Sequence, residues 1–203
     1  MSRNLNPRVK RQRRIGEKLF THGEKSFGKR PYPPGQHGPK GSGKLSEYGV
    51  RLREKQKAQL VYGLLERQFR TYFAKAKRKP GNTGEFLFQL LEQRLDNIVF
   101  RAGFARSREG ARQLIRHGHI MVKGRRVDIP SFQVKVNDVV SLHTNSTAKT
   151  GVQNIIKELE NYEAPAWISL DKKLFAATIR EMPTFDVSAS NINPQLIVEF
   201  YSR

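Results

Sequence analysis

The chain has 203 residues and a formal charge of +20 at pH 7, with 38 Lys and Arg, 18 Asp and Glu, and no Cys. The lack of Cys excludes disulfides, thiolate chemistry and a cysteine-built zinc site. No long apolar run, signal segment or lipidation pattern is found, which disfavours an anionic membrane as the partner and predicts a soluble cytoplasmic protein. Since so large a charge repels itself unless a polyanion neutralises it, we expect a nucleic-acid-binding protein.

The positive charge is concentrated towards the N-terminus. Residues 1–80 carry 22 Lys and Arg against 5 Asp and Glu, whereas residues 81–128 carry 9 against 5 and residues 129–203 carry 7 against 8. A protein that needs charge only for solubility would spread it along the chain. The distribution therefore indicates an N-terminal binding region.

Residues 1–46 are predicted to be a basic, Pro/Gly-rich RNA-binding arm. A basic run at residues 8–14 is followed by a stretch, residues 30–44, whose Pro and Gly content rules out regular helix or strand. Such a polar coil would be disordered alone. We prefer an arm that becomes ordered on RNA, with Tyr32 or His37 available for stacking, to a merely flexible tail.

Residues 47–91 are predicted to form a helical domain. Over residues 47–78, one long helix or two, apolar side chains recur at i+3 and i+4 and give a core-facing stripe. Arg and Lys occupy much of the remaining surface and are expected to face phosphates, although a merely solvated charged face is a serious alternative. Pro80 and Gly81 break the helix, and Asn82 with Glu85 predicts a capping box for the next one.

Residues 92–145 are predicted to form a small α/β RNA-binding module of two helices packed on about four short antiparallel strands. Its centre is residues 106–126, where Ser107 and Gly118 are expected to begin and end a helix. Arg108, Arg112 and Arg116 recur every four residues and are expected to form a cationic stripe opposite the apolar face. A basic hairpin follows, so the module presents a convex cationic surface suited to a phosphate backbone.

Residues 146–203 are predicted to pack back on the helical domain. A polar linker at 144–151 leads into this segment, which continues with a short helix at 152–161 and the most apolar part of the chain. Residues 196–201 are expected to cover the helices of residues 47–78. The fold class is therefore α+β, with the module inserted into a discontinuous helical domain.

Five motifs carry a resemblance to a known family. They are YPPGQHG at 32–38, YGVRLREKQK at 48–57, GNTG at 81–84, RLDN at 94–97 and the stretch 106–126. In this order, and with the VEFYS ending at 198–202, they closely resemble the bacterial and organellar family of small-subunit ribosomal protein four. The resemblance covers essentially the whole chain.

The resemblance implies a non-enzymatic protein that binds 16S ribosomal RNA at a multi-helix junction of the 5′ domain and helps to nucleate subunit assembly. Its expected neighbours are small-subunit protein five and the channel through which mRNA enters, with an effect on decoding accuracy. Some bacterial members repress their own operon. The location would be cytoplasmic ribosomes, or organellar ones for an organellar gene. No membrane partner and no obligate homo-oligomer is expected.

One departure from the family concerns metal. Many members carry four cysteines that bind zinc or an iron–sulfur cluster in the arm, and this chain has none. We therefore expect a cysteine-free branch with no cofactor and no metal site, whose arm is held by packing and by RNA.

The candidate RNA-binding residues are basic side chains of the arm, the first helices and the module, together with a few stacking or polar groups. They are Arg8, Lys10, Arg11, Arg13, Arg14, Tyr32, Gln36, His37, Lys44, Arg51, Arg53, Lys55, Lys57, Arg67, Arg70, Arg106, Arg108, Arg112, Arg116, His117, His119, Lys123, Arg125 and Arg126. These contacts would give position and shape readout. Substituting Arg112 and Arg116 together should weaken RNA binding without unfolding the protein.

Two other functions compete with this interpretation. An RNA-modifying enzyme could use the same module for delivery, but it would need a second domain with a catalytic group in a cleft, and Asp96 is better explained as a salt bridge or cap. A nucleoid or other DNA-binding protein would also use a large basic surface. His117 and His119 flank a helix end, where capping or RNA contact is a better explanation than metal binding.

Overall fold

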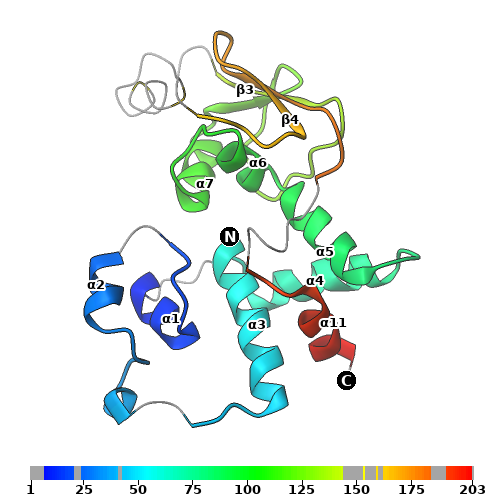
Figure 1. Cartoon of the computed structure of the whole chain (residues 1–203). Helices are drawn as coiled ribbons and strands as arrows, with labels where there is room; N and C mark the ends of the chain where they lie inside the picture. The colour runs from blue at the N-terminus through cyan, green and yellow to red at the C-terminus, as the bar shows by residue number, and fades with distance from the viewer. Residues whose placement is uncertain are drawn as a thin grey trace. The chain divides into compact units, whose positions relative to one another are not determined.

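The computed structural model describes residues 7–20, 24–40, 43–143, 153, 159, 162–183 and 191–202. The chain forms two units, one made of Met1–Gly84 with Asp186–Arg203 and the other of Glu85–Phe185 (Figure 1). None of the helices within the described ranges combines the length and apolar character needed to cross a membrane. The predicted linker and helix at residues 144–161 lie almost wholly outside the described residues.

Helices build the first unit. They are α1 (Arg8–Ile15), α2 (Glu24–Lys29), the short 3-10 helix η1 (Gly38–Lys40), α3 (Glu47–Tyr62), α4 (Glu66–Lys77) and α11 (Pro194–Ser202). The Ser46 hydroxyl caps α3 by accepting a hydrogen bond of 3.2 Å from the backbone of Gly49. Gly63 ends α3 in the left-handed region, at φ 59°, so residues 47–77 form two helices.

The core of the first unit lies between α3, α4 and α11. The apolar stripe predicted for residues 47–78 is buried, with Phe69 and Ala76 fully inaccessible. α11 packs along α3 (Figure 1), and its Tyr201 ring stacks on Phe73 of α4 with centroids 4.6 Å apart. α11 is thus the C-terminal element that covers these helices.

The arm contains more regular structure than the sequence predicted. Residues 8–15 form a helix rather than coil, because Gln12 and Ile15 turn inward on one face and Gly16, at φ 81°, supplies a left-handed C-cap. α1 packs against α3, so a tertiary partner stabilises a sequence whose charge alone would oppose a helix. Between residues 30 and 40, η1 is the one regular element, in keeping with the Pro and Gly content.

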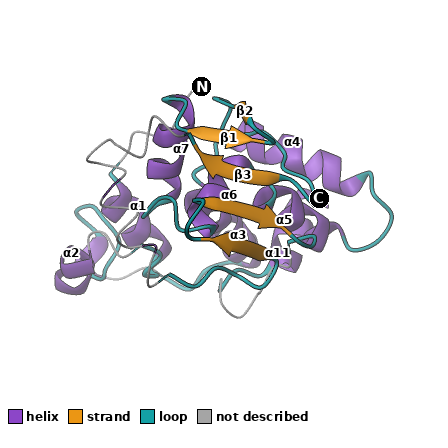
Figure 2. Ribbon diagram, turned by 90° about the horizontal axis from the view of Figure 1, so that it is seen from above, coloured by secondary structure: helices purple, strands orange, loops and turns teal. Residues whose placement is uncertain are grey.

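The second unit is α+β, as predicted. α5 (Thr83–Glu92) leads into it, followed by α6 (Leu95–Arg101) and α7 (Arg108–Arg116). Its antiparallel sheet has the order β2-β1-β3-β5-β4, with β1 (Ile120–Val122), β2 (Arg125–Arg126), β3 (Val139–Leu142), β4 (Ile168–Asp171) and β5 (Ala176–Ile179). Figure 2 shows the strands as one layer with α6 and α7 behind it.

The predicted N-cap residues Asn82 and Ser107 both cap helices. Asn82 accepts a hydrogen bond of 3.0 Å from the backbone of Gly84 at the start of α5, and Ser107 accepts one of 3.1 Å from Gly110 at the start of α7. Gly118 is left-handed, at φ 73°. Local sequence signals therefore placed these helix ends correctly.

Strands are distributed differently from the prediction. No strand forms over residues 127–137, and the sheet is instead completed by β4 and β5, from residues assigned by sequence to the returning C-terminal segment. β5 pairs with β3 in the register Val140↔Ala177, because β3 would otherwise leave one edge unpaired. The second unit therefore extends to Phe185 and not to residue 145.

The core of the second unit explains this difference. Ala177 and Ile179, on β5, are buried in one cluster with Leu95, Ile115 and Ile120. The sequence identified this part of the chain as apolar, but composition does not specify which unit its apolar residues pack against.

Candidate nucleic-acid interface

The hairpin after α7 presents a group of exposed cations. β1 alternates buried Ile120 and Val122 with half-buried Met121, while both residues of β2, Arg125 and Arg126, are exposed. Lys123 and Gly124 form the turn with left-handed φ angles of 51° and 74°, which suits a tight hairpin. Arg116, at the end of α7, is also exposed.

The expected cationic stripe of α7 is only partly outward. The Arg108 guanidinium donates a hydrogen bond of 2.7 Å to the Asn97 side chain and lies 4.6 Å from the centroid of the Phe100 ring. The Nε of Arg112 lies 2.6 Å from a carboxylate oxygen of Asp96, and its side chain is 20% exposed. The stripe is therefore not opposite the core; at 100° per residue, Arg112 stands about 60° from buried Ile115.

A buried polar network on α6 holds these arginines. Asp96 is 1% exposed and also binds the buried Arg94 guanidinium at 2.8 Å, so the structure bears out a salt bridge for this carboxylate. The buried carboxylate of Glu92 accepts hydrogen bonds from Asn97 at 2.6 Å and from Arg101 at 3.1 Å. The network fixes α7 to α6 and orients the arginine side chains of α7.

The arm residues form a mixed group. Arg13 donates a hydrogen bond of 3.0 Å to the backbone oxygen of Tyr32 and its guanidinium lies 5.0 Å from the centroid of that ring. Burial, and then the charge of Arg8, lowers the pKa of Arg11; burial also lowers the pKa of Arg8. Several candidates remain exposed in this region, namely Lys10, Arg14, Gln36, His37 and Lys44.

Three candidates on α3 face other parts of the first unit. Arg51 binds Glu199 at 2.7 Å, and Lys55 binds Glu66 at 2.8 Å. Lys57, only 2% exposed, binds Glu17 at 2.5 Å and donates to the backbone oxygen of Asn191. Each of these side chains therefore pairs with a carboxylate of the same unit, 11 residues away for Lys55, 40 for Lys57 and 148 for Arg51. Their contact with RNA stays a prediction.

Further exposed cations of the first unit lie on α4 and just beyond its C-terminal end. Arg67 and Arg70 are exposed, as are four cations that the candidate set omitted: Lys75, Lys77, Arg78 and Lys79. A signal for them was present, because the run Lys77–Lys79 precedes the helix-breaking Pro80 and Gly81. Basic residues in a last helical turn also offset the helix dipole, so the run alone does not distinguish capping from RNA binding.

The remaining candidates occupy intermediate positions. Arg53 is half-buried on α3, Arg106 and His117 are exposed, and His119 is half-buried. The rings of His117 and His119 lie edge to face with centroids 6.0 Å apart. Across the described ranges, no three His, Asp or Glu side chains converge in a way that could hold a metal ion.

The fold and its exposed Arg and Lys side chains define an RNA-binding module of the S4 class attached to a helical domain. Residues 93–140 match the family described as S4 domain, and residues 3–92 match the family described as Ribosomal protein S4/S9 N-terminal domain.

Full-length relatives carry the identification further. The chain is 47% identical over 206 residues to the small ribosomal subunit protein uS4 of Roseiflexus sp. (strain RS-1). The uS4 proteins of Opitutus terrae and Dechloromonas aromatica are 46% identical over 203 residues and 47% identical over 209 residues. Each match covers both chains completely. The chain belongs to the uS4 family of small-subunit ribosomal proteins, as a member without cysteine.

This membership decides between two of the expected functions. The family consists of structural ribosomal proteins and not of enzymes, so the RNA-modifying alternative is set aside. The relatives named above are bacterial, and the organellar alternative has no support among them.

Proposed function

We propose that this protein binds 16S ribosomal RNA at a multi-helix junction of the 5′ domain, nucleates assembly of the small subunit and contributes to translational accuracy. The observation that carries the proposal is the separation of its cations into two sets. Basic side chains that face the interior are neutralised by carboxylates, as in Arg112 with Asp96 and Lys55 with Glu66. The exposed set, Arg67 and Arg70 on α4 with Arg125 and Arg126 on the hairpin, is left to neutralise phosphates. Lys123, in the hairpin turn, differs from them because its ammonium lies 2.7 Å from the buried carboxylate of Asp138.

The two exposed sets would act in different ways. The hairpin bases Arg125 and Arg126 stand on a sheet, so their backbone positions are fixed before RNA arrives, and this reduces the entropic cost of binding. The Lys and Arg side chains of the arm and of α4 supply more positive charge. Contacts of both kinds fix position and shape and carry little base-by-base specificity.

The proposed partners follow from the same assignment. The protein would sit in cytoplasmic ribosomes beside small-subunit protein five, near the channel through which mRNA enters. Omitting protein five from a reconstitution should leave the 16S rRNA complex intact, since the proposed primary contact is with RNA. Loss of that complex without protein five would contradict primary binding.

Hydroxyl-radical footprinting of 16S rRNA with the purified protein tests the central claim. We expect protection focused at one junction of helices in the 5′ domain. The affinity should also fall with salt, with a slope of log K on log salt of about −0.7 to −0.9 per phosphate neutralised. Diffuse protection, or an affinity insensitive to salt, would contradict the proposal.

Competition decides between rRNA and DNA as the partner. At matched salt, excess duplex DNA should displace little of a labelled 5′-domain transcript, because an A-form junction offers a shape that duplex DNA lacks. Equal competition by both nucleic acids would favour the DNA-binding alternative.

A further inference from the structure

A buried glycine just after α7 leaves room for an arginine of the neighbouring hairpin. Gly118 is buried and has a left-handed φ of 73°. A β-carbon at this position would overlap the Nε, Cζ and Nη2 atoms of Arg126. The guanidinium of Arg126 therefore occupies the space that the side chain of any other residue would begin to fill, and only glycine permits this close approach.

The other end of the Arg126 side chain is fixed by the sheet. Arg126 pairs with Met121 in the register of β1 and β2, and Arg125 pairs with Val122. Because successive side chains of a strand point to opposite faces, the two arginines of β2 are directed to different faces of the sheet. Arg126 shares a face with Met121, and its guanidinium is the one that lies against Gly118.

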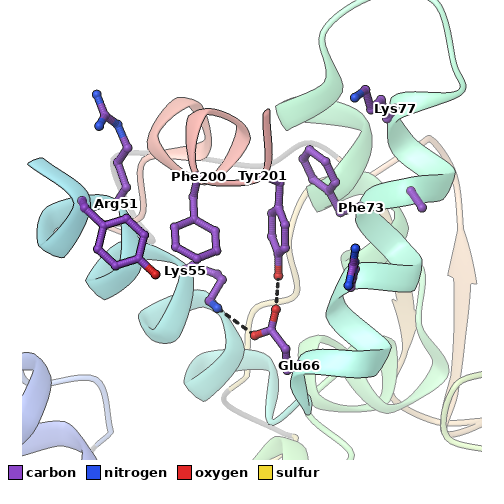
Figure 3. A pocket seen from close by; sticks show the side chains of 10 residues that line it. Arg51, Lys55, Glu66, Phe73, Lys77, Phe200 and Tyr201 are labelled. Atoms are coloured by element: carbon purple, nitrogen blue, oxygen red, sulfur yellow. Dashed lines mark hydrogen bonds and ion pairs between the residues drawn. The ribbon is translucent and has the colours of Figure 1, made fainter. Parts of the chain in front are cut away.

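Other positioned cations of this protein have a carboxylate partner. In the first unit, the ammonium of Lys55 lies 2.8 Å from a carboxylate oxygen of Glu66, as Figure 3 shows. In the hairpin itself, the ammonium of Lys123 lies 2.7 Å from Asp138. Arg126 differs from both, because it takes part in no hydrogen bond or ion pair within the described part of the chain.

This combination of placement and missing acceptor requires an acceptor from outside the protein. A guanidinium is always charged and presents five N–H donors in a planar array that matches the oxygens of a phosphate. The contact with Gly118 restricts where those donors can be, so a phosphate that binds them meets a smaller entropic cost. Arg126 is also exposed, so a backbone phosphate can reach it.

We infer that Arg126 donates hydrogen bonds to a phosphate of the RNA backbone and that Gly118 is the residue that positions its guanidinium. The inference rests on the proposed function and names one contact within it. Gly118 acts through Arg126 and need not touch RNA. Arg125, which has the same charge but lies on the other face of β2, contributes to the general attraction for RNA without this placement.

A purely structural role for Arg126 is the rival explanation. A cation near the last turn of a helix interacts favourably with the helix dipole, and Arg126 lies beside the residue that follows α7. However, the carbonyl oxygens of residues 113–115 already accept hydrogen bonds from the backbone of residues 117–119. The end of α7 is therefore satisfied without the arginine, which favours the phosphate.

The first test measures binding of the full-length protein to a 5′-domain 16S rRNA transcript over a series of salt concentrations. Arg126→Ala should weaken binding about tenfold, as expected for lost hydrogen bonds to a charged group. It should also reduce the magnitude of the slope of log K on log salt by about 0.7 to 0.9, which corresponds to one phosphate. Arg126→Lys keeps the charge, so the slope should be retained and the loss of affinity should be smaller than with Ala.

The second test is a double-mutant cycle for the positioning role. Gly118→Ala should weaken binding when Arg126 is present and should have no further effect in the Arg126→Ala background, because residues in contact are not additive. Gly124→Ala is the matched control: Gly124 has a φ of 74° and open space around it, so its substitution brings similar strain and should leave affinity unchanged.

Folding of the variants is controlled separately. Binding is measured at a temperature at which circular dichroism shows every variant to be folded. If Gly118→Ala does not fold, Arg125→Ala replaces it in the comparison, and it should weaken binding less than Arg126→Ala. Equal losses at Arg125 and Arg126 would then overturn the positioning role.

The remaining outcomes separate the contact, its positioning and the proposed function. Wild-type affinity for Arg126→Ala, or a weakened affinity with an unchanged salt slope, would overturn the phosphate contact and leave the proposed function intact. Equal weakening by Gly118→Ala with and without Arg126 would overturn the positioning role of Gly118. Failure of the wild-type chain to bind the transcript would overturn the proposed function and this inference together.

Discussion

The Nε atom of Arg112 lies 2.6 Å from a carboxylate oxygen of Asp96, so a residue expected on the binding face of α7 also holds that helix to α6. Because Asp96 is 1% exposed and accepts hydrogen bonds from Arg94 as well, its charge depends on protein partners rather than on water. Binding and stability are therefore coupled at Arg112. They are separable at Arg116, which is exposed.

Replacing Arg112 by Ala should destabilise the protein by about 2 kcal/mol, because a buried carboxylate loses one of its two cationic partners. Arg116→Ala on the same helix should change stability by less than about 0.5 kcal/mol and weaken rRNA binding. Urea unfolding measures the first effect and filter binding the second. This revises the expectation that substituting both arginines would spare the fold. Equal stability of the two variants would contradict the structure.

Replacing Lys57 by Met should release the arm. Lys57 joins Glu17 of the arm, Glu54 of α3 and the backbone of Asn191, so its loss leaves carboxylates without their cation at a cost of about 2 kcal/mol. Limited trypsin digestion should then cleave within residues 8–20 faster than in wild type. Lys10→Met, on an exposed arm position, is the control and should not raise cleavage elsewhere in the arm.

Gly118→Ala should be more destabilising than Gly124→Ala. Both glycines are left-handed, at φ 73° and 74°, so the backbone strain of about 1–2 kcal/mol is shared. A β-carbon at Gly118 would in addition overlap the Arg126 guanidinium, whereas Gly124 has open space around it. Thermal melts of the two variants compare these costs. Equal melting temperatures would show that Arg126 moves away freely.

Acid should weaken the α3–α4–α11 cluster through Glu66. Its pKa in the folded protein is lowered, by hydrogen bonds that outweigh burial. A carboxylate with a lowered folded pKa stabilises the protein above its ordinary pKa of 4.5, and this stabilisation is lost as pH falls through the folded value. Glu66→Gln should therefore be less stable than wild type at pH 7, with a difference that shrinks below about pH 4. Glu47→Gln, at a carboxylate 81% exposed, is the control and should change stability at pH 7 by less than about 0.5 kcal/mol in urea unfolding.

Local signals in the sequence were sufficient to predict the helix ends and to identify the family. Ser107, Asn82 and Gly118 act through atoms within three residues of themselves, so their roles could be inferred without a fold. The motifs that carry the family resemblance are likewise short and contiguous. Charge composition alone predicted a nucleic-acid partner, since no packing arrangement neutralises a surplus of this size.

The tertiary structure decided which Lys and Arg side chains face inward and which strands share a sheet. Lys57 and Glu17 are 40 residues apart, and Arg51 and Glu199 are 148 apart, so periodicity could not distinguish a paired base from one that faces solvent. β5 belongs to the sheet of the second unit because it completes the hydrogen bonding of β3; the apolar residues of β5 are equally compatible with either unit. Burial is encoded locally, whereas the partner that provides it is fixed only when distant segments meet.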